Sequence, residues 1–417
     1  MTFSLVDTFF IGMLGTEQLA AIGFTIPVIF IVMNFSMGLT IGLSSVLAKT
    51  LGSGNHHLAA RITTDNLILS TFIVCLISFS GLLTISPLFT LLGADPEILI
   101  YINEYMQLWY LGVAFLVIPM VGNGAIRATG DMKTPSVIMI IAGGLNGILD
   151  PFFIFGIGPF PEMGMRGAAV ATLIAWAVTF VAAIWILRVR EKLITYKLPT
   201  LQEVLASWQP VLYIGIPAAV TNLLIPLATG VLTAIVANYG PEAVAAFGVG
   251  SRIEVIAMVV IMSLSTTMQP FIGQNLGAGK LSRIREAISI SFKFTLWFQF
   301  LIYGLLILFS GLIASTFSDD PEVIKVIVLF LLIVPVSYAF QGLQMVISSV
   351  LNALNQPIDA MFLSIIRLFV FYIPFAYIGS IYYDIEGIFW GMVISNFIAC
   401  AIAYSWVTRK LNILLNS

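Results

Sequence analysis

Long apolar stretches separated by short polar connections dominate the pattern along this chain. A helix that crosses the ~30 Å hydrocarbon core of a bilayer needs about 20 predominantly apolar residues, and stretches of about that length recur from end to end. The pattern predicts about twelve transmembrane helices, at residues 1–15, 18–48, 64–92, 98–122, 135–157, 165–188, 208–238, 243–272, 284–317, 323–350, 357–382 and 387–408. The chain is therefore predicted to be an all-α, polytopic membrane protein.

The first of these stretches is shorter than the others. From Phe3 to Leu14 a helix rises only about 18 Å, little more than half of the hydrocarbon core. Either the natural start lies upstream of Met1, or the first helix begins within the bilayer. A cleaved signal peptide fits poorly, because the stretch has no basic start and contains Asp7.

Composition narrows the class of protein. Hydrophobic residues make up 59% of the chain and charged residues only 9%, against roughly 25% charged residues in soluble proteins. The 18 basic residues against 20 acidic ones, with no basic tract, argue against a nucleic-acid partner. The scarce Cys and His residues form no metal-ligand cluster, and no nucleophile–base set appears. We expect neither an enzyme nor a bound cofactor or metal.

Lys and Arg are distributed unevenly between the two sides of the predicted membrane. Most of them lie in connections that follow even-numbered spans or in the C-terminal tail, whereas the connections after odd-numbered spans hold only Arg166 and Lys325. Because basic connections stay in the cytoplasm, both termini are predicted to be cytoplasmic. The expected location is the cytoplasmic (inner) membrane.

Sequence motifs occur twice along the chain. Gly15–Gly23 returns as Gly240–Gly248 and Asp95–Glu97 returns as Asp320–Glu322, both at the same interval. The repeat predicts two pseudo-symmetric six-helix bundles related by an axis along the membrane normal. The expected division is an N-terminal lobe at 1–187, a cytoplasmic linker at 188–208 and a C-terminal lobe at 209–417. Such a protein is expected to transport by alternating access.

Polar residues inside the apolar stretches of the first half are predicted to gather in one layer. Counting helix rise from the outer surface places Asp7 and Asp150 about 10–12 Å deep. Tyr105 and Thr172 reach a similar depth, and Asn146 lies one turn from Asp150 on the same helix face. Burial and a second nearby carboxylate both favour the protonated form of a carboxyl group. The layer therefore suits binding of a coupling proton.

The second repeat does not copy these acids. Leu232 occupies the position that corresponds to Asp7, and Tyr372 the one that corresponds to Asp150. A pair of acids that only held helices together would be expected in both halves. The asymmetry therefore favours a dedicated task for the two aspartates.

The second half has its own ionisable residues at membrane depth. Glu254 and Arg252 are candidates for substrate contact, and a structural pairing of Glu254, with Arg367 for instance, stays open. Asp65 lies near a helix end, where a solvated capping role is expected. Three methionines are candidates for an adaptable substrate lining or, equally, for ordinary core packing: Met33, Met37 and Met258.

Several motifs resemble the multidrug and toxic compound extrusion (MATE) transporters, most closely the DinF-like branch. They are the segment from Val6 to Gly15, the loop Gly130–Pro135, the stretch Asn146–Pro151 and the helix start Gly164–Thr172. The resemblance implies a V-shaped, two-lobed antiporter that exports amphipathic, often cationic drugs in exchange for H⁺ or Na⁺. It also implies that Asp7 and Asp150, with Tyr105, Asn146 and Thr172, form a proton-linked network.

The sodium-linked branch of this family differs from the present sequence in its acidic residues. That branch places essential acids in the seventh and tenth helices, and residues 208–238 and 323–350 contain none. The difference favours protons, with Na⁺ at Asp7 as the open alternative. The expected partners are small organic substrates and the lipid bilayer, and the expected state is a monomer.

Other membrane proteins offer alternative interpretations. A flippase for lipids or lipid-linked oligosaccharides shares the two-bundle architecture, but its cleft is expected to carry several basic residues, and only Arg252, Lys293 and Arg367 are available. The acidic–basic loop that major-facilitator transporters carry after their second helix is absent. A passive channel has no need of a carboxylate pair on one side of a repeat.

Overall fold

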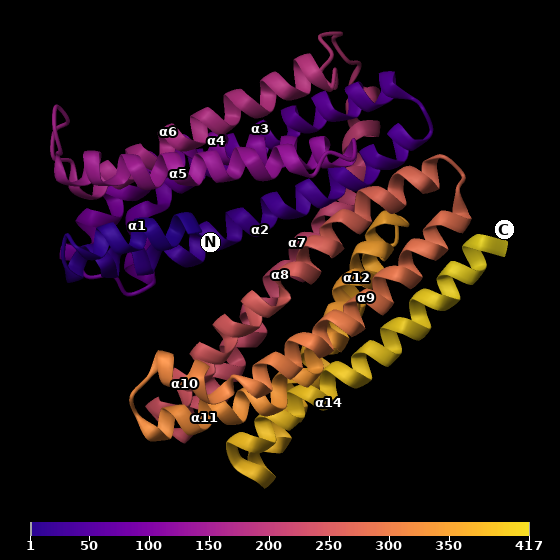
Figure 1. The fold of residues 1–417 in the computed structure, drawn as a ribbon. Coiled ribbons are helices and arrows are strands. Elements are labelled where there is room, and N and C mark those ends of the chain that lie inside the picture. The colour runs from indigo at the N-terminus through magenta and orange to yellow at the C-terminus, as the bar shows by residue number, and fades with distance from the viewer. Residues whose placement is uncertain (1, 417) are drawn as a thin grey trace. The chain divides into compact units, whose positions relative to one another are not determined.

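The computed structural model describes residues 2–416 of the chain, and the side chains of residues 7–412. Almost all of this part is helical (Figure 1), which confirms the predicted fold class. The helices in chain order are α1 (Thr2–Gly12), α2 (Thr16–Gly52), α3 (His56–Leu91), α4 (Pro96–Ala128), α5 (Lys133–Phe155), α6 (Gly164–Trp185), η1 (Ile186–Arg190), α7 (Leu201–Val236), η2 (Ala237–Tyr239), α8 (Pro241–Gly277), α9 (Leu281–Leu308), α10 (Ser310–Phe317), α11 (Pro321–Ile333), η3 (Val334–Ser337), α12 (Tyr338–Ala353), α13 (Pro357–Ile365), η4 (Ile366–Tyr372) and α14 (Ile373–Asn416).

Ten helical segments of the described chain are long and apolar enough to cross a membrane. Two features account for the difference from the twelve predicted spans. Helix α1 has 11 described residues and is too short to cross alone. The last segment, Pro357–Asn412, is broken where Tyr383 (φ −138°) and Asp384 (φ 50°) leave helical geometry. This break separates the two predicted spans 357–382 and 387–408.

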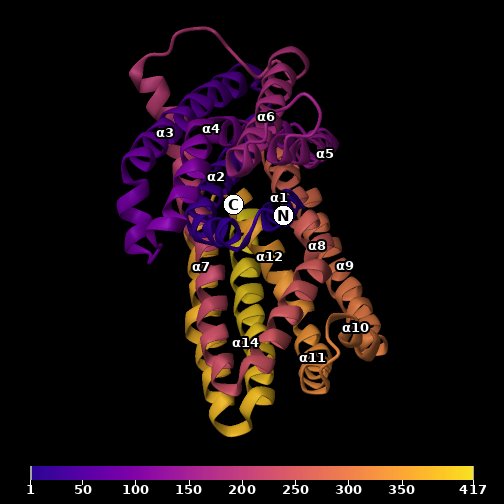
Figure 2. The same ribbon diagram turned by 90° about the vertical axis from the view of Figure 1, so that its left-hand side faces the viewer.

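The chain forms two compact units, residues 1–216 and 217–417. In the first unit α4 packs against α2, α3 and α6, and α5 packs against α6 and α1. In the second unit α12 packs against α8, α9 and α14, and Figure 2 shows α12 and α14 running alongside each other. Each unit encloses its own cluster of buried apolar side chains.

The boundary between the two compact units lies inside α7, after the predicted linker at 188–208. Polar contacts attach this linker and the first turns of α7 to α3. Arg61 donates to the carbonyl oxygen of Lys197 at 2.6 Å, and Ser207 Oγ donates to Asp65 Oδ2 at 2.7 Å. Trp208 Nε1 donates to the carbonyl oxygen of Asp65 at 2.7 Å. The connection therefore belongs to the first unit.

Asp65 is the centre of these contacts. Its side chain is fully buried and pairs with Arg61 one turn away, through Nη2 to Oδ1 at 2.8 Å and Nε to Oδ2 at 2.9 Å. The expectation of a solvated cap at Asp65 was wrong, because the start of α7 covers this face of α3. We call Arg61, Asp65, Ser207 and Trp208 the α3–α7 clasp.

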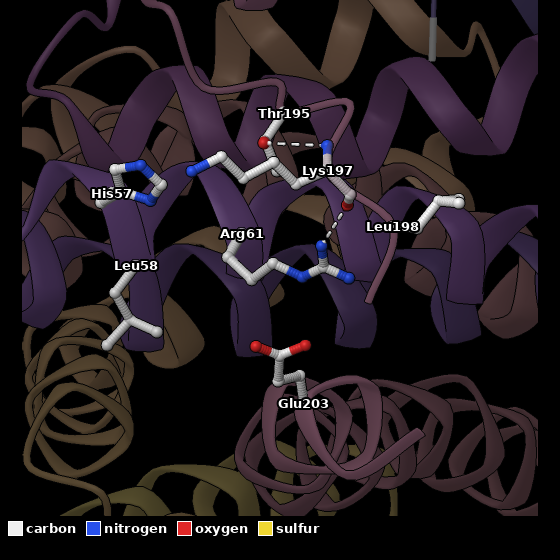
Figure 3. Close-up of a pocket in the computed structure, with 7 residues that line it drawn as sticks. All are labelled: His57, Leu58, Arg61, Thr195, Lys197, Leu198 and Glu203. Atoms are coloured by element: carbon white, nitrogen blue, oxygen red, sulfur yellow. Dashed lines mark hydrogen bonds between the residues drawn. The ribbon is translucent and has the colours of Figure 1, made fainter. Parts of the chain in front are cut away.

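A surface pocket of the first unit lies beside the clasp (Figure 3). Figure 3 shows His57, Leu58 and Arg61 of α3, with Lys197 of the connection near the Arg61 guanidinium and Glu203 of α7 opposite. Arg61 is held by the clasp, so its charge is already compensated. The pocket is therefore explained by the packing of the segment between η1 and α7 over α3.

Helices α5 and α6 approach each other closely at Gly167. A Cβ atom at this position would lie 2.3 Å from the carbonyl oxygen of Phe153. Replacing Gly167 by Ala should force α5 and α6 apart and destabilise the protein by about 1–3 kcal/mol, detectable as a lower melting temperature of the purified protein. Gly144→Ala on α5 is the matched control, because its Cβ would meet nothing within 4 Å. Equal melting temperatures for the two variants would contradict the close approach.

Candidate functional site

Four helices of the first unit bring the predicted polar residues together. Asp7 comes from α1, Tyr105 from α4, Asn146 and Asp150 from α5, and Thr172 from α6. All five side chains are buried, with Asp150 and Asn146 fully so. We call these five residues the N-unit polar cluster.

Hydrogen bonds connect most of the cluster. Asn146 Nδ2 donates to Asp150 Oδ1 at 3.2 Å and lies 3.3 Å from Thr172 Oγ1. Thr172 Oγ1 in turn donates to Asp7 Oδ2 at 3.4 Å. Asn146 and Thr172 thus bridge the two acids, and the one-turn spacing of Asn146 and Asp150 on α5 gives the geometry that the sequence predicted.

The two carboxyl groups also lie within hydrogen-bonding reach of each other. Within the described residues, Asp7 Oδ1 and Asp150 Oδ2 have no donor from another side chain, and no basic side chain forms an ion pair with either acid. Tyr105 interacts electrostatically with both. Two adjacent carboxylates without a cation are costly to bury when both are charged. The arrangement is therefore suited to hold one exchangeable proton or a cation.

Packing fixes α1 against α5 at this site. The ring of Phe10 packs edge-on against Phe155 with centroids 6.3 Å apart, and Ile11 is fully buried. Both contacts lie within about one turn of the acids, so the position of Asp7 depends on apolar packing on either side of it. The sequence does not reveal the packing of α1 against α5, because it depends on how each helix is rotated about its own axis.

The predicted substrate residues are more dispersed. Met33 and Met37 are partly exposed on α2 of the first unit, whereas Met258 is only 3% exposed and packs in the core of the second. Gln299 Nε2 contacts the Met258 sulfur at 3.4 Å. Arg252 is exposed on α8, whereas Glu254, two residues later, is only partly exposed and contacts α12.

Glu254 belongs to a second group of polar side chains in residues 217–417. Gln341 Nε2 of α12 donates to Glu254 Oε1 at 2.8 Å. Arg367 and Tyr372 of η4 interact electrostatically with Glu254, and Tyr338 does so from the start of α12. Tyr338 and Gln341 were not among the predicted site residues, because neither is ionisable at neutral pH and their helix, α12, contains no acidic residue.

Comparison with known proteins identifies the class of molecule. The MatE family model matches residues 1–152 and 217–378, which is most of the chain. The chain belongs to the MatE family. Its members are transporters, so this multi-pass membrane protein is a transporter and not an enzyme.

Several relatives of this MatE protein carry functional names. The FAD transporter of Shewanella oneidensis is 40% identical over 95% of this chain and 89% of its own length. The probable multidrug resistance protein YoeA of Bacillus subtilis is 26% identical over 89% of this chain and 81% of its own.

Solved transporter structures match the fold over essentially the whole chain. The bent form of the Vibrio cholerae MATE transporter VcmN is 32% identical, covers 99% of this chain and 94% of its own, and gives a TM-score of 0.93. A second structure is that of a Pyrococcus furiosus transporter, described as having a binding pocket of reverse polarity that suggests a different function. It is 27% identical, covers 100% of this chain and 92% of the Pyrococcus chain, and gives a TM-score of 0.88.

Proposed function

We propose that this MatE protein is a secondary antiporter of the cytoplasmic membrane that exports small organic compounds in exchange for protons. Alternating access between the two six-helix halves is the expected mode of transport. The observation that carries the proposal is the pair of buried carboxyl groups, Asp7 and Asp150, bridged by Asn146 and Thr172.

The N-unit polar cluster has the chemistry of a proton-binding site. When one proton is shared, a single O–H donates between the acids and the pair carries one negative charge. When it leaves, two charges repel each other and the surrounding donors must rearrange. Proton binding thus changes which hydrogen bonds join α1, α5 and α6, and a transporter can use such a change to shift between states.

Sodium is the alternative coupling ion, since a cation can also sit between two carboxylates. Inverted membrane vesicles distinguish the two. In inverted vesicles, export by the protein appears as accumulation of ethidium inside the vesicles. We expect this accumulation when a ΔpH is imposed in the absence of sodium. Accumulation that follows a sodium gradient at constant pH would contradict the proton proposal.

The cargo has two candidates. Amphipathic organic cations follow from the family resemblance and from relatives named as multidrug exporters. Flavin adenine dinucleotide (FAD) is the second candidate, because the relative named FAD transporter is 40% identical to this chain, far above the 26% identity of YoeA. Measuring ethidium and FAD accumulation in the same vesicles separates them. Transport of neither would contradict the proposed export of organic compounds.

The orientation in the membrane is a further prediction. Single cysteines introduced at Asn55, Leu198 and Ser282 should react with an impermeant maleimide only from the cytoplasmic side, because these positions flank the basic connections. A cysteine at Gly158, between α5 and α6, is the matched control and should react from outside. Labelling of the first three positions from outside would reverse the proposed topology.

A further inference from the structure

The second group of polar side chains has an excess of hydrogen-bond donors. It consists of Glu254 on α8, Tyr338 and Gln341 on α12, and Arg367 and Tyr372 on η4, and we call it the C-unit polar cluster. Helix α12 packs against both α8 and α13, the helix that η4 continues. All five residues belong to the second unit, residues 217–417.

Arg367 is the cation of this cluster, and the described residues give it no ion-pair partner. The Glu254 carboxylate accepts from Gln341 at 2.8 Å and interacts with Arg367 only at longer range. Arg367 Nε is buried without an acceptor in the described part of the chain, and so is the hydroxyl of Tyr338. A buried guanidinium nitrogen that lacks an acceptor is costly, and a bound anion supplies that acceptor.

Local backbone geometry aligns two of the donors. Segment η4 is a π-helix of seven residues, with Arg367 and Tyr372 near its two ends. In an α-helix, residues five apart lie on different faces, and the wider turn of a π-helix brings them closer to one face. Such π-segments within longer helices occur frequently at functional sites. The π-helical turn therefore brings Arg367 and Tyr372 nearer to one face of the helix, in line with their electrostatic interaction.

The cluster is only partly enclosed. Glu254, Gln341, Arg367 and Tyr372 are all partly exposed, while Tyr338 is fully buried. Arg367 contributes a guanidinium to the cluster, and Tyr338 and Tyr372 contribute hydroxyl groups. Guanidinium and hydroxyl groups are donors from which phosphate oxygens accept hydrogen bonds.

We infer that the C-unit polar cluster binds a phosphate group of the transported compound, with Arg367 as its anchor and Tyr338 and Tyr372 as further donors. The inference rests on the proposed export function and names the cargo class as organic phosphates such as a flavin dinucleotide. Gln341 supports the site by holding the Glu254 carboxylate away from Arg367.

Binding to the purified protein tests the site independently of transport. FAD and riboflavin share the isoalloxazine ring, but riboflavin has no phosphate. In detergent, Arg367→Gln should weaken FAD binding by about 10- to 100-fold, the range that a hydrogen bond to a charged group spans. Riboflavin binding should not change, and inorganic pyrophosphate should compete with FAD only in the wild-type protein.

Three further variants keep the result interpretable. Lys293→Gln removes an exposed cation from α9 of the same unit and should leave FAD binding unchanged. Tyr338→Phe should weaken FAD binding less than Arg367→Gln does. Arg367→Lys should retain part of the affinity, which guards against loss of binding through misfolding.

Three outcomes overturn the inference. Equal FAD affinity in the wild-type and Arg367→Gln proteins would mean that Arg367 has a structural role and does not bind phosphate. Failure of the wild type to bind either FAD or pyrophosphate would lead to the same conclusion. Nanodiscs of phosphatidylglycerol and phosphatidylcholine test a lipid source: if phosphatidylglycerol occupies the site and FAD cannot displace it, the site belongs to a lipid headgroup. Ethidium accumulation driven by ΔpH is measured separately, so loss of coupling is not confused with loss of phosphate binding.

Discussion

Replacing either Asp7 or Asp150 by Asn is expected to abolish ΔpH-driven transport. Both carboxyl groups are buried and bridged by Asn146 and Thr172. An amide at either position cannot release a proton in the pH range of a cell, so the two positions can no longer share a proton between two carboxyl groups. Purified protein in liposomes with an imposed ΔpH and a fluorescent cation provides the measurement.

Folding should survive both substitutions, since removing a buried charge relieves its desolvation cost. Equal membrane yield and an unchanged melting temperature would document this. Glu97→Gln, an exposed acid in the first turn of α4, is the matched control and should transport at the wild-type rate. If both Asn variants also transport at that rate, the aspartates are structural and Glu254 becomes the next candidate for coupling.

Replacing Asp65 by Ala is expected to destabilise the protein by about 3–5 kcal/mol, because it leaves a largely buried guanidinium without its partner. Asp65 also accepts from Ser207 Oγ, so the substitution frees the start of α7 from α3 as well. For a unit of this size the melting temperature should fall by roughly 10 °C. Thermal unfolding of the detergent-purified protein measures the change.

An exposed ion pair on another helix provides the control for the clasp. Glu322 and Lys325 on α11 are both more than 70% exposed and lie 4.0 Å apart, so Glu322→Ala should change stability by less than about 0.5 kcal/mol. Similar melting temperatures for Asp65→Ala and Glu322→Ala would show that the clasp contributes no more than a surface pair.

The membrane environment explains why the hydrophobic pattern predicted the helices well. Each span must satisfy its own backbone hydrogen bonds in the bilayer, so apolar length alone indicates a helix. The breaks were harder to place: Tyr383 and Asp384 interrupt one continuous helical run, and η4 departs from α-geometry without a Pro or Gly inside it. Packing against neighbouring helices, not local sequence, determines such features.

The sequence by itself determined the helical class, the places of the long apolar helices and the repeat of motifs in the two halves. It also placed Asn146 on the same face as Asp150, because helix periodicity is local. Only the tertiary structure decided that Thr172 contacts Asp7, that Asp65 is buried under α7 and that Glu254 faces Gln341. These contacts depend on the rotation and spacing of packed helices, and many residues far apart in the chain set both.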